Sequence, residues 1–271
     1  MLARPIPIVR TIDSVKQPEM DLLAEEAPLE IRIIFGQNDN RKEKSLSVTM
    51  RTPGDDISLA LGFLFTEGMI DSPSEVLEIR HCEQTPLEAR GNVIKVWMNT
   101  DWFWPQHSME RNFYTTSSCG VCGKSSIESI HSRCSYSISS LKFDEEILGV
   151  LPEKLRLAQI AFKHTGGIHA SALFNNLGEI QSVAEDVGRH NALDKIIGKA
   201  FINHQLPLSQ TILLVSGRLS FELVQKAATA GIPVIAAIGA PSSLAVELAK
   251  KMNIKCYGFV KEKRWNNYTP E

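Results

Sequence analysis

The second half of the chain alternates between helix-like and strand-like segments, and this alternation limits the folds open to it. A helix-like run precedes two strand-like runs that are joined by a turn, and three further helix–strand pairs follow. This order, α-β-β-α-β-α-β-α-β, predicts a sheet that is at least partly parallel and is covered by helices. The predicted segments are residues 152–162, 168–174, 179–184, 191–201, 211–215, 220–230, 233–237, 242–252 and 254–259.

The first hundred residues predict a smaller sheet. Asp55 is placed to cap a helix whose apolar residues recur at helical spacing, and Gly68 is placed to end it. The polar, proline-containing residues 1–28 predict a partly ordered tail. The predicted elements are strands at 29–35, 45–50, 76–80 and 92–98, the first two forming a hairpin with a long tip, and one helix that begins near residue 57.

These patterns predict an α/β (α+β) protein of two domains. Residues 1–115 form a small β-rich α+β domain with a flexible tail, and residues 116–271 form a larger domain that begins with a cysteine loop. Near the end of the first domain, residues 101–113 are irregular and carry four aromatic residues. These side chains either tuck a loop onto the core or form a lid or wall for a flat ligand; the aromatic residues are Trp102, Phe103, Trp104 and Phe113.

Composition and charge exclude several classes of protein. The net charge of −2 over 271 residues gives no electrostatic reason to expect nucleic acid or an anionic membrane as a partner. The longest apolar runs, 59–65 and 232–240, are far shorter than the ~20 residues of a membrane span. No secretory signal is visible, so we expect a soluble cytoplasmic protein. Five cysteines, an odd number, fit a reducing compartment better than a disulfide framework.

Three strand-to-helix junctions in the second half are suited to bind anions. Free N–H groups at helix starts, hydroxyl groups and arginine together make phosphate sites, and open sheets of this class bind ligands beyond the carboxyl ends of their strands. If all three lie at one edge of the sheet, they predict a phosphorylated ligand. The junctions are Val215-Ser216-Gly217-Arg218, Ala240-Pro241-Ser242-Ser243 and Glu185-Asp186-Val187-Gly188-Arg189-His190-Asn191.

A pair of thiols, Cys119 and Cys122, lies two residues apart in a glycine-containing loop. A helix-like run follows directly, so the second thiol is predicted near a helix N-terminus. The positive end of a helix lowers a thiol's pKa and raises the fraction of thiolate. Lys124 adds a further positive charge. The loop therefore predicts a mobile, activated thiol pair.

Zinc and dithiol redox chemistry are two alternatives for this loop. His131 and Cys134 complete a set of four possible zinc ligands, but a helix over 122–134 would separate its ends by about 18 Å. A thioredoxin-like protein needs a different order of elements around its thiols. Nucleophilic sulfur chemistry, in which a thiolate carries sulfur as a persulfide, is favoured. Cys82 and Cys256 lie in or beside strand-like runs and are expected to be packed thiols.

Several motifs in the chain resemble the signatures of the FdhD/NarQ family of formate dehydrogenase accessory sulfurtransferases. They occur in the same order as in the family, and the resemblance runs from about residue 28 to residue 264. The motifs are Met50-Arg51-Thr52-Pro53-Gly54-Asp55-Asp56, Ser117-Ser118-Cys119-Gly120-Val121-Cys122-Gly123-Lys124, Thr165-Gly166-Gly167-Ile168-His169-Ala170, Glu185-Asp186-Val187-Gly188-Arg189-His190-Asn191-Ala192, Ser216-Gly217-Arg218 with Ser220-Phe221-Glu222, and Ala240-Pro241-Ser242-Ser243-Leu244-Ala245.

The resemblance implies a specific activity. Members of the family carry sulfur from a cysteine desulfurase to the molybdenum cofactor of formate dehydrogenase, through a persulfide that falls on Cys119, with Cys122 as the second thiol. They bind the bis-molybdopterin guanine dinucleotide form of that cofactor and work as homodimers in the cytoplasm. The segment that holds the cofactor near the C-terminus falls on Phe259, Val260, Lys261, Glu262, Lys263 and Arg264.

The resemblance also implies a fold and raises a further alternative. The second domain of the family is similar to cytidine deaminases, so we expect a three-layer, cytidine-deaminase-like arrangement. Deaminases place zinc ligands and a glutamate at two helix starts. The matching positions here offer only His190 as a ligand, which leaves both helix starts free to hold phosphate and indicates no resident metal. The chain departs from the family at Gly239, where serine is common, and in the tail at residues 265–268.

The sequence leaves two functions open. In the first, Cys119 carries the sulfur, while a phosphate-binding set holds the nucleotide and the segment 259–264 contacts a guanine. That set comprises Ser216, Gly217, Arg218, Ser242 and Ser243, with Arg189, His190 and Asp186 near it, unless Asp186 and Arg189 simply pair with each other. In the second, the protein is a cofactor chaperone without chemistry, which would not need Cys119.

Overall fold

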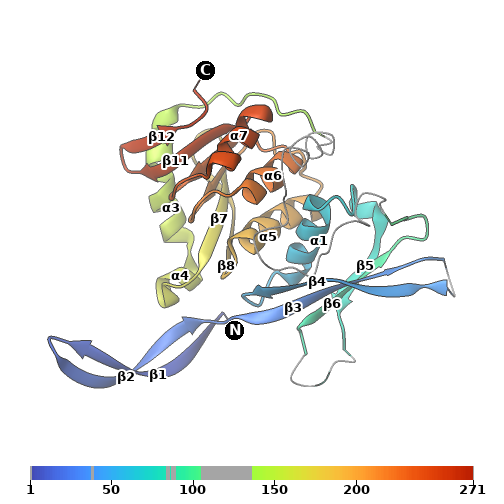
Figure 1. Cartoon of the computed structure of the whole chain (residues 1–271), viewed down its shortest axis with the longest axis horizontal. Coiled ribbons are helices and arrows are strands. Elements are labelled where there is room, and N and C mark those ends of the chain that lie inside the picture. Colours follow the sequence, from blue (N-terminus) through green and yellow to red (C-terminus); the bar gives the residue numbers. More distant parts are fainter. Residues whose placement is uncertain (1, 38–39, 84–85, 87–89, 105–135, 271) are drawn as a thin grey trace.

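The computed structural model describes residues 2–37, 40–83, 86, 90–104 and 136–270 (Figure 1). The described chain is a mixed α/β structure with three sheets. The larger sheet is six-stranded, in the order β12-β11-β10-β9-β7-β8. Its strands are β7 (His169–Phe174), β8 (Ile180–Asp186), β9 (Ile212–Val215), β10 (Val234–Ala237), β11 (Lys255–Lys261) and β12 (Arg264–Asn267).

The direction of these strands follows the predicted alternation. The strands β9, β10 and β11 are parallel neighbours, because each is reached through a helix that crosses the sheet. The strand β7 is antiparallel to both β9 and β8, and β12 is antiparallel to β11. The prediction of a partly parallel sheet covered by helices is therefore confirmed, with β12 added at its edge.

Helices cover both faces of the six-stranded sheet, and each face has its own apolar core (Figure 1). The helices α5 (Arg189–Ile202), α6 (Phe221–Thr229) and α7 (Ser243–Lys251) cover one face. The other face packs against a 3-10 helix, η5 (Glu145–Val150), and α3 (Leu151–Ala158). Successive strand residues point to opposite faces, so Leu213 belongs to the first core and Leu214 to the second.

The first hundred residues form a four-stranded sheet in the order β4-β3-β6-β5, with one α-helix packed against it. The elements are β3 (Ala27–Phe35), β4 (Lys42–Arg51), α1 (Asp56–Thr66), a short 3-10 helix η2 (Pro73–Glu75), β5 (Val76–His81) and β6 (Val93–Met98). The four predicted strands, the hairpin and the helix are confirmed, and Gly68 has the positive φ of 70° expected just after a helix end.

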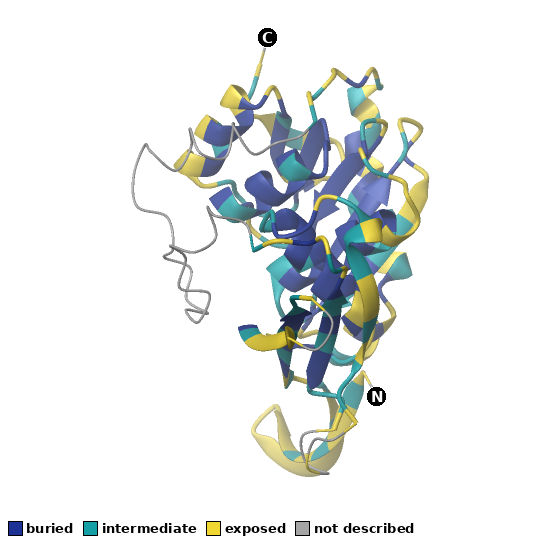
Figure 2. Cartoon of the chain, turned by 90° about the vertical axis from the view of Figure 1, so that its right-hand side faces the viewer, coloured by how far each residue is buried: buried dark blue, intermediate teal, exposed yellow. Residues whose placement is uncertain are grey.

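The helices α1 and α5 pack so closely that their backbones touch. A Cβ atom added at Gly62 would lie 1.9 Å from the carbonyl oxygen of Asp194, and one added at Gly198 would lie 1.8 Å from that of Ser58. Glycine is the only residue that fits at either position. Because α1 belongs to the small sheet and α5 to the large one, this contact joins them into one continuous core, which Figure 2 shows in dark blue.

Three predictions about local structure are wrong, and a fourth element, the last predicted strand, is confirmed with different bounds. Residues 1–28 are not a partly ordered tail: they contain the hairpin β1 (Ala3–Ile12) and β2 (Val15–Ala24), which projects from the body and contacts α4 (Ile160–Thr165) at its base. The helix predicted over 152–162 is interrupted at Gln159, whose ψ of 97° is extended. Asp55 makes no side-chain cap; its carboxylate pairs with Lys199 at 2.8 Å. The last predicted strand continues two residues further and turns back as β12.

No described helix has the length and apolar character needed to cross a bilayer. The proposed division into domains at residue 115 stays a prediction, because it falls within residues that the structure does not describe.

Candidate functional site

The three junctions lie at one edge of the six-stranded sheet. Since β9, β10 and β11 are parallel and β7 runs antiparallel between β8 and β9, the carboxyl ends of β8, β9, β10 and β11 all face the same way. The amino ends of β7 and β12 lie at this edge too. The condition under which the sequence predicts a phosphorylated ligand is therefore met. We call this edge the carboxyl edge of the sheet.

The loops at the carboxyl edge are joined by backbone hydrogen bonds that continue the sheet beyond its strands. The N–H of Gly239 donates to the carbonyl of Gly217 at 3.1 Å, and the N–H of Phe259 donates to the carbonyl of Gly239 at 3.0 Å. A Cβ atom at Gly239 would lie 3.0 Å from the Gly217 oxygen and 3.1 Å from the Arg218 Cα. Glycine at position 239 thus permits a close approach of two loops that a serine would push apart.

Arg218 offers an unused positive charge at this edge. Its side chain is exposed, and it makes no hydrogen bond or ion pair with any residue that the structure describes. The backbone N–H groups of Gly217 and Arg218 likewise have no partner within the described chain. Two successive free N–H groups beside a guanidinium form a concavity suited to an anion.

The serines at this edge differ in what they have left to offer. The hydroxyl of Ser216 accepts the N–H of Ala170 at 2.9 Å, and the hydroxyl of Ser242 caps α7 by accepting the N–H of Ala245 at 3.2 Å. Both hydroxyls still have a proton to donate. Ser243 is exposed, and its side chain makes no hydrogen bond within the described residues.

Arg189 and His190 begin α5, whose N-cap residue Gly188 supplies no side chain to the free N–H groups. The Nε atom of Arg189 is buried without a hydrogen-bond partner in the described chain. The Nε2 atom of His190 lies 3.2 Å from the hydroxyl of Ser220 and 3.9 Å from a carboxylate oxygen of Glu222. Burial, helped by the charges of Lys226 and Arg189, lowers the pKa of His190 to about 4, so the ring is neutral at pH 7.

Asp186 serves the packing of the structure. It does not pair with Arg189, which was one of the two possibilities left open; its buried carboxylate forms an ion pair with Lys195 at 2.7 Å. The same carboxylate accepts the N–H groups of Thr52 and Gly188 at 3.1 and 2.8 Å. Asp186 therefore holds the small sheet against the start of α5 and has no lone pair free for a ligand.

Residues of the motif 50–56 complete this connection. The carbonyl of Thr52 accepts from Lys195 at 2.9 Å, and the amide of Asn191 donates to the carbonyl of Met50 at 2.8 Å. Arg51 is buried and donates two hydrogen bonds, of 3.0 and 2.9 Å, to the carboxylate of Asp56. Two of the motifs that the sequence singled out therefore bind each other.

The segment 259–264 lies where β11 ends and turns into β12. Phe259 has a positive φ of 54°, which is uncommon for a residue with a side chain, and it is 37% exposed. The side chain of Val260 is fully buried in the second core, so only its backbone could meet a ligand. The remaining four residues are exposed and form no ion pair within the described residues: Lys261, Glu262, Lys263 and Arg264.

The sequence missed two polar side chains near this edge. His169 begins β7 and lies against Gly217, where an added Cβ would be 3.3 Å from its ring; burial and the charge of Arg189 lower the pKa of His169. The motif Thr165–Ala170 was the available signal for it. Lys226 is buried on α6 and contacts both carboxylate oxygens of Asp194, at 2.9 and 3.0 Å.

In the ion pair of Lys226 and Asp194, burial and the partner's charge shift the pKa of each residue in opposite directions. Burial raises the pKa of Asp194 to about 6, although Lys226 acts in the opposite direction. Burial acts against the charge of Lys226 as well, but the carboxylates of Asp194 and Glu67 outweigh it and raise the pKa of Lys226. A buried lysine can be read from sequence only when its partner is known, and Asp194 lies 32 residues away.

The two thiols Cys119 and Cys122 lie outside the described residues, as do His131, Cys134 and Phe113. The prediction that Cys256 is a packed thiol is confirmed, because it is fully buried and burial raises its pKa to about 12. Cys82 is half-buried. No group of three His, Cys, Asp or Glu residues within the described chain is arranged to hold a metal ion.

Comparison with known proteins gives consistent matches over nearly the whole chain. The model of the FdhD/NarQ family matches residues 24–271. The sulfur carrier protein FdhD of Streptomyces avermitilis is 44% identical over 269 residues, covering 97% of this chain and 93% of the relative. The protein of the same name from Mycolicibacterium paratuberculosis is 46% identical, covering 94% and 92%.

One solved structure has the same overall fold. It comes from Desulfotalea psychrophila, was assigned as a formate dehydrogenase accessory protein, and superposes with a TM-score of 0.73 over 100% of this chain and 98% of its own. Its sequence is 24% identical to this one, so the likeness concerns the fold.

Proposed function

Because the chain belongs to the FdhD/NarQ family, we propose that it is a sulfur carrier that serves formate dehydrogenase. In this proposal the protein is a cytoplasmic homodimer that takes sulfur from a cysteine desulfurase. It passes the sulfur to the molybdenum cofactor, bis-molybdopterin guanine dinucleotide, which is its substrate in transit. The similarity to proteins named sulfur carrier protein FdhD, at 44% and 46% identity, supports this role.

The proposed chemistry has two steps. In the first, the Cys119 thiolate attacks the terminal sulfur of a desulfurase persulfide; the S–S bond breaks, and the desulfurase leaves as a thiolate. In the second, the Cys122 thiolate attacks the Cys119 sulfur and releases the terminal sulfur as sulfide to molybdenum. The sulfur is reduced by two electrons, and the two thiols become a disulfide that a thiol reductant must reopen.

The observation that carries the nucleotide part of the proposal is the carboxyl edge of the sheet. Arg218 and the free N–H groups of Gly217 and Arg218 supply charge and donors for a pyrophosphate. Arg189 at the start of α5 and Ser243 on α7 flank them, with Ser216, Ser242 and His190 as further donors. Phe259, exposed and held by Gly239, presents an aromatic face on which a guanine could stack.

The fold supports this arrangement as well. In the proposal, the half built on the six-stranded sheet is a three-layer, cytidine-deaminase-like unit whose two helix starts hold phosphate where a deaminase would hold zinc. The uncapped start of α5 at Gly188 is consistent with such a use.

Two measurements test the proposal. Isothermal titration with GDP should show binding that Arg218→Ala weakens by about tenfold or more, since a charge-assisted bond contributes about 1.5–3 kcal/mol. Mass spectrometry after incubation with desulfurase and cysteine should show about one added sulfur atom on Cys119 in both proteins. Unchanged GDP affinity in Arg218→Ala would refute the assignment of the pyrophosphate site, and wild-type protein that never gains sulfur would refute the carrier role.

A further inference from the structure

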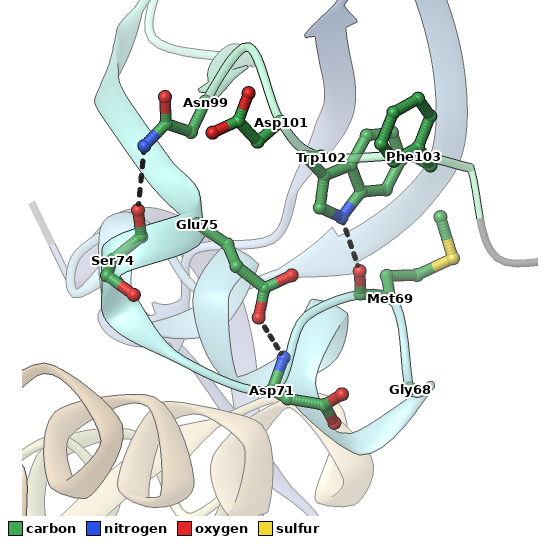
Figure 3. Close-up of a pocket in the computed structure, with 9 residues that line it drawn as sticks. All are labelled: Gly68, Met69, Asp71, Ser74, Glu75, Asn99, Asp101, Trp102 and Phe103. Carbon is green, nitrogen blue, oxygen red and sulfur yellow. Dashed lines mark hydrogen bonds between the residues drawn. The ribbon is translucent and has the colours of Figure 1, made fainter.

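A cavity of about 530 Å³ lies beyond the C-terminal end of α1, where the chain enters and leaves the η2 turn (Figure 3). None of the residues assigned above to the thiol chemistry or the nucleotide lines it. The lining residues are Gly68, Met69, Asp71, Ser74, Glu75, Asn99, Asp101, Trp102 and Phe103.

Two aromatic residues form one wall of the cavity, and they differ in exposure. Trp102 is buried, and its indole N–H donates to the carbonyl of Met69 at 2.9 Å. Its ring also packs against Phe35, with ring centres 5.7 Å apart. Phe103 follows directly and is 78% exposed, more than any other large apolar side chain in the described chain. The packing reading of the aromatic segment is thus confirmed for Trp102, whereas Phe103 presents its ring to solvent.

The rest of the lining carries negative charge that no ion pair within the described chain balances. Asp71, Glu75 and Asp101 line the cavity, and none of the nine lining residues is basic. These carboxylates form no ion pair within the described residues. One oxygen of Glu75 accepts the N–H groups of Asp71 and Ser72 at 2.7 and 2.8 Å, which fixes its carboxylate in place beside the cavity.

A cavity lined by aromatic side chains and by carboxylates is suited to bind an arginine side chain. A guanidinium is planar, stacks on aromatic faces, and donates to a carboxylate with two parallel hydrogen bonds. Phe103 adds exposed apolar surface to the cavity wall, which gives a polypeptide more to contact than a small cation would need. We propose that this cavity is the docking site for an arginine-bearing segment of a partner protein.

The position of the cavity relates such docking to the candidate site. Glu67 directly precedes the lining residue Gly68 and pairs with Lys226 of α6 at 3.5 Å. The start of α6 lies at the carboxyl edge of the sheet, where Ser220 meets His190. A protein held in the cavity would therefore lie beside the candidate site. Its identity as sulfur donor or acceptor rests on the proposed function, whereas the binding itself does not.

Tryptophan NMR signals provide a test at the level of single residues. The chain has four tryptophans, so ¹⁵N-labelled indole gives four signals that Trp→Phe variants can assign. Titration with the capped hexapeptide Arg-Gly-Arg-Gly-Arg-Gly should move the Trp102 signal saturably and leave that of Trp265, on the far core, in place. The peptide with lysine in place of each arginine should bind several-fold more weakly, because an ammonium group neither stacks on an aromatic ring nor donates two parallel hydrogen bonds to a carboxylate.

Matched variants separate the cavity from the general surface. Asp101→Asn and Phe103→Ala should each raise the dissociation constant by about fivefold or more. Glu247→Gln and Leu157→Ala, which change an exposed carboxylate and a 75% exposed apolar side chain elsewhere, should leave it unchanged. A stationary Trp102 signal, equal movement of all four signals, or equal losses in the cavity and control variants would overturn the proposal. Because no sulfur transfer is measured, failure here is distinct from failure of the carrier role.

Discussion

Replacing Asp186 with asparagine should destabilise the protein far more than the same change at Asp55. Both carboxylates pair with a lysine at nearly the same distance, 2.7 Å to Lys195 and 2.8 Å to Lys199. Their surroundings differ: the side chains of Asp186 and Lys195 are 0% and 3% exposed, whereas those of Asp55 and Lys199 are 50% and 33% exposed. The two substitutions therefore compare a buried ion pair with an exposed one at nearly the same distance between nitrogen and oxygen.

The hydrogen bonds of Asp186 make the asparagine variant costly. One oxygen of Asp186 faces Lys195 and the N–H of Thr52, and the other faces the N–H of Gly188 and the amide of Asn191. In either orientation, the NH₂ group of an asparagine would oppose two donors. Breaking one partner of a buried pair costs about 3–5 kcal/mol. At Asp55 the expected cost is below about 1 kcal/mol, because solvent screens an exposed pair.

Urea and thermal unfolding measure the difference. For a chain of this size, a loss of 1 kcal/mol in the free energy of unfolding lowers the thermal midpoint by about 2–4 °C. Asp186→Asn should therefore lower the thermal midpoint by about 6–20 °C, and Asp55→Asn by less than about 4 °C. The double variant Asp186→Asn with Lys195→Met should regain part of the loss, because it no longer buries an unpaired charge. Equal thermal midpoints for Asp186→Asn and Asp55→Asn would refute the argument that burial, and not the distance between the charged atoms, decides how much an ion pair contributes to stability.

Three further predictions follow from the packing, the buried histidine and the thiol. Gly62→Ala should cost about 2 kcal/mol or more, because a Cβ placed 1.9 Å from a backbone oxygen must force the helices apart, while Gly167→Ala, whose Cβ would meet nothing closer than 3.7 Å, should change the unfolding free energy by less than about 0.5 kcal/mol. The pKa of His190 is near 6.5 in the unfolded chain and about 4 in the folded chain, so the free energy of unfolding should fall as the pH drops through that window. For a side chain 31% exposed, we expect the loss of stability from this histidine to be about 1–2 kcal/mol. Urea titrations at pH 7 and 4.5 measure this loss, and His190→Gln should abolish it. Cys119→Ala should bind GDP normally and fail to activate formate dehydrogenase; full activation by this variant would favour the cofactor chaperone.

The order and class of most elements could be predicted from the sequence, because they depend on local patterns. Apolar runs bounded by glycine, serine and proline marked β9 and β10, and helical spacing marked α1 and α5. The junctions at the ends of β8, β9 and β10 needed only one further condition, a shared edge, which the strand order supplies. Local pattern and fold agree here because each strand is followed by its own helix.

The sequence was a poor guide where structure depends on distant partners. The hairpin of β1 and β2 has prolines and exposed side chains, so no alternation of apolar residues marked it. Nothing in the sequence around Lys195 marks it as buried, yet its amine lies against Asp186 and the carbonyl of Thr52, 143 residues away. A charged residue reads as exposed until its partner is known.

Residues of the candidate site can be divided into those whose polar groups stabilise the fold and those whose side chains are free to bind a ligand. The polar groups of Thr52 and Asp186 are occupied in joining the small sheet to α5, and those of Arg51 bind Asp56 within the small-sheet half. Changes there should lower stability before they alter ligand affinity. The side chains of Arg218 and Phe259 have a smaller role in packing: that of Arg218 has no partner within the described chain, and that of Phe259 is 37% exposed. A side chain that contributes little to the folded state is free to be selected for a ligand. Ligand affinity should therefore respond to Arg218 and Phe259 at constant melting temperature, and the opposite pattern would move the site away from the carboxyl edge.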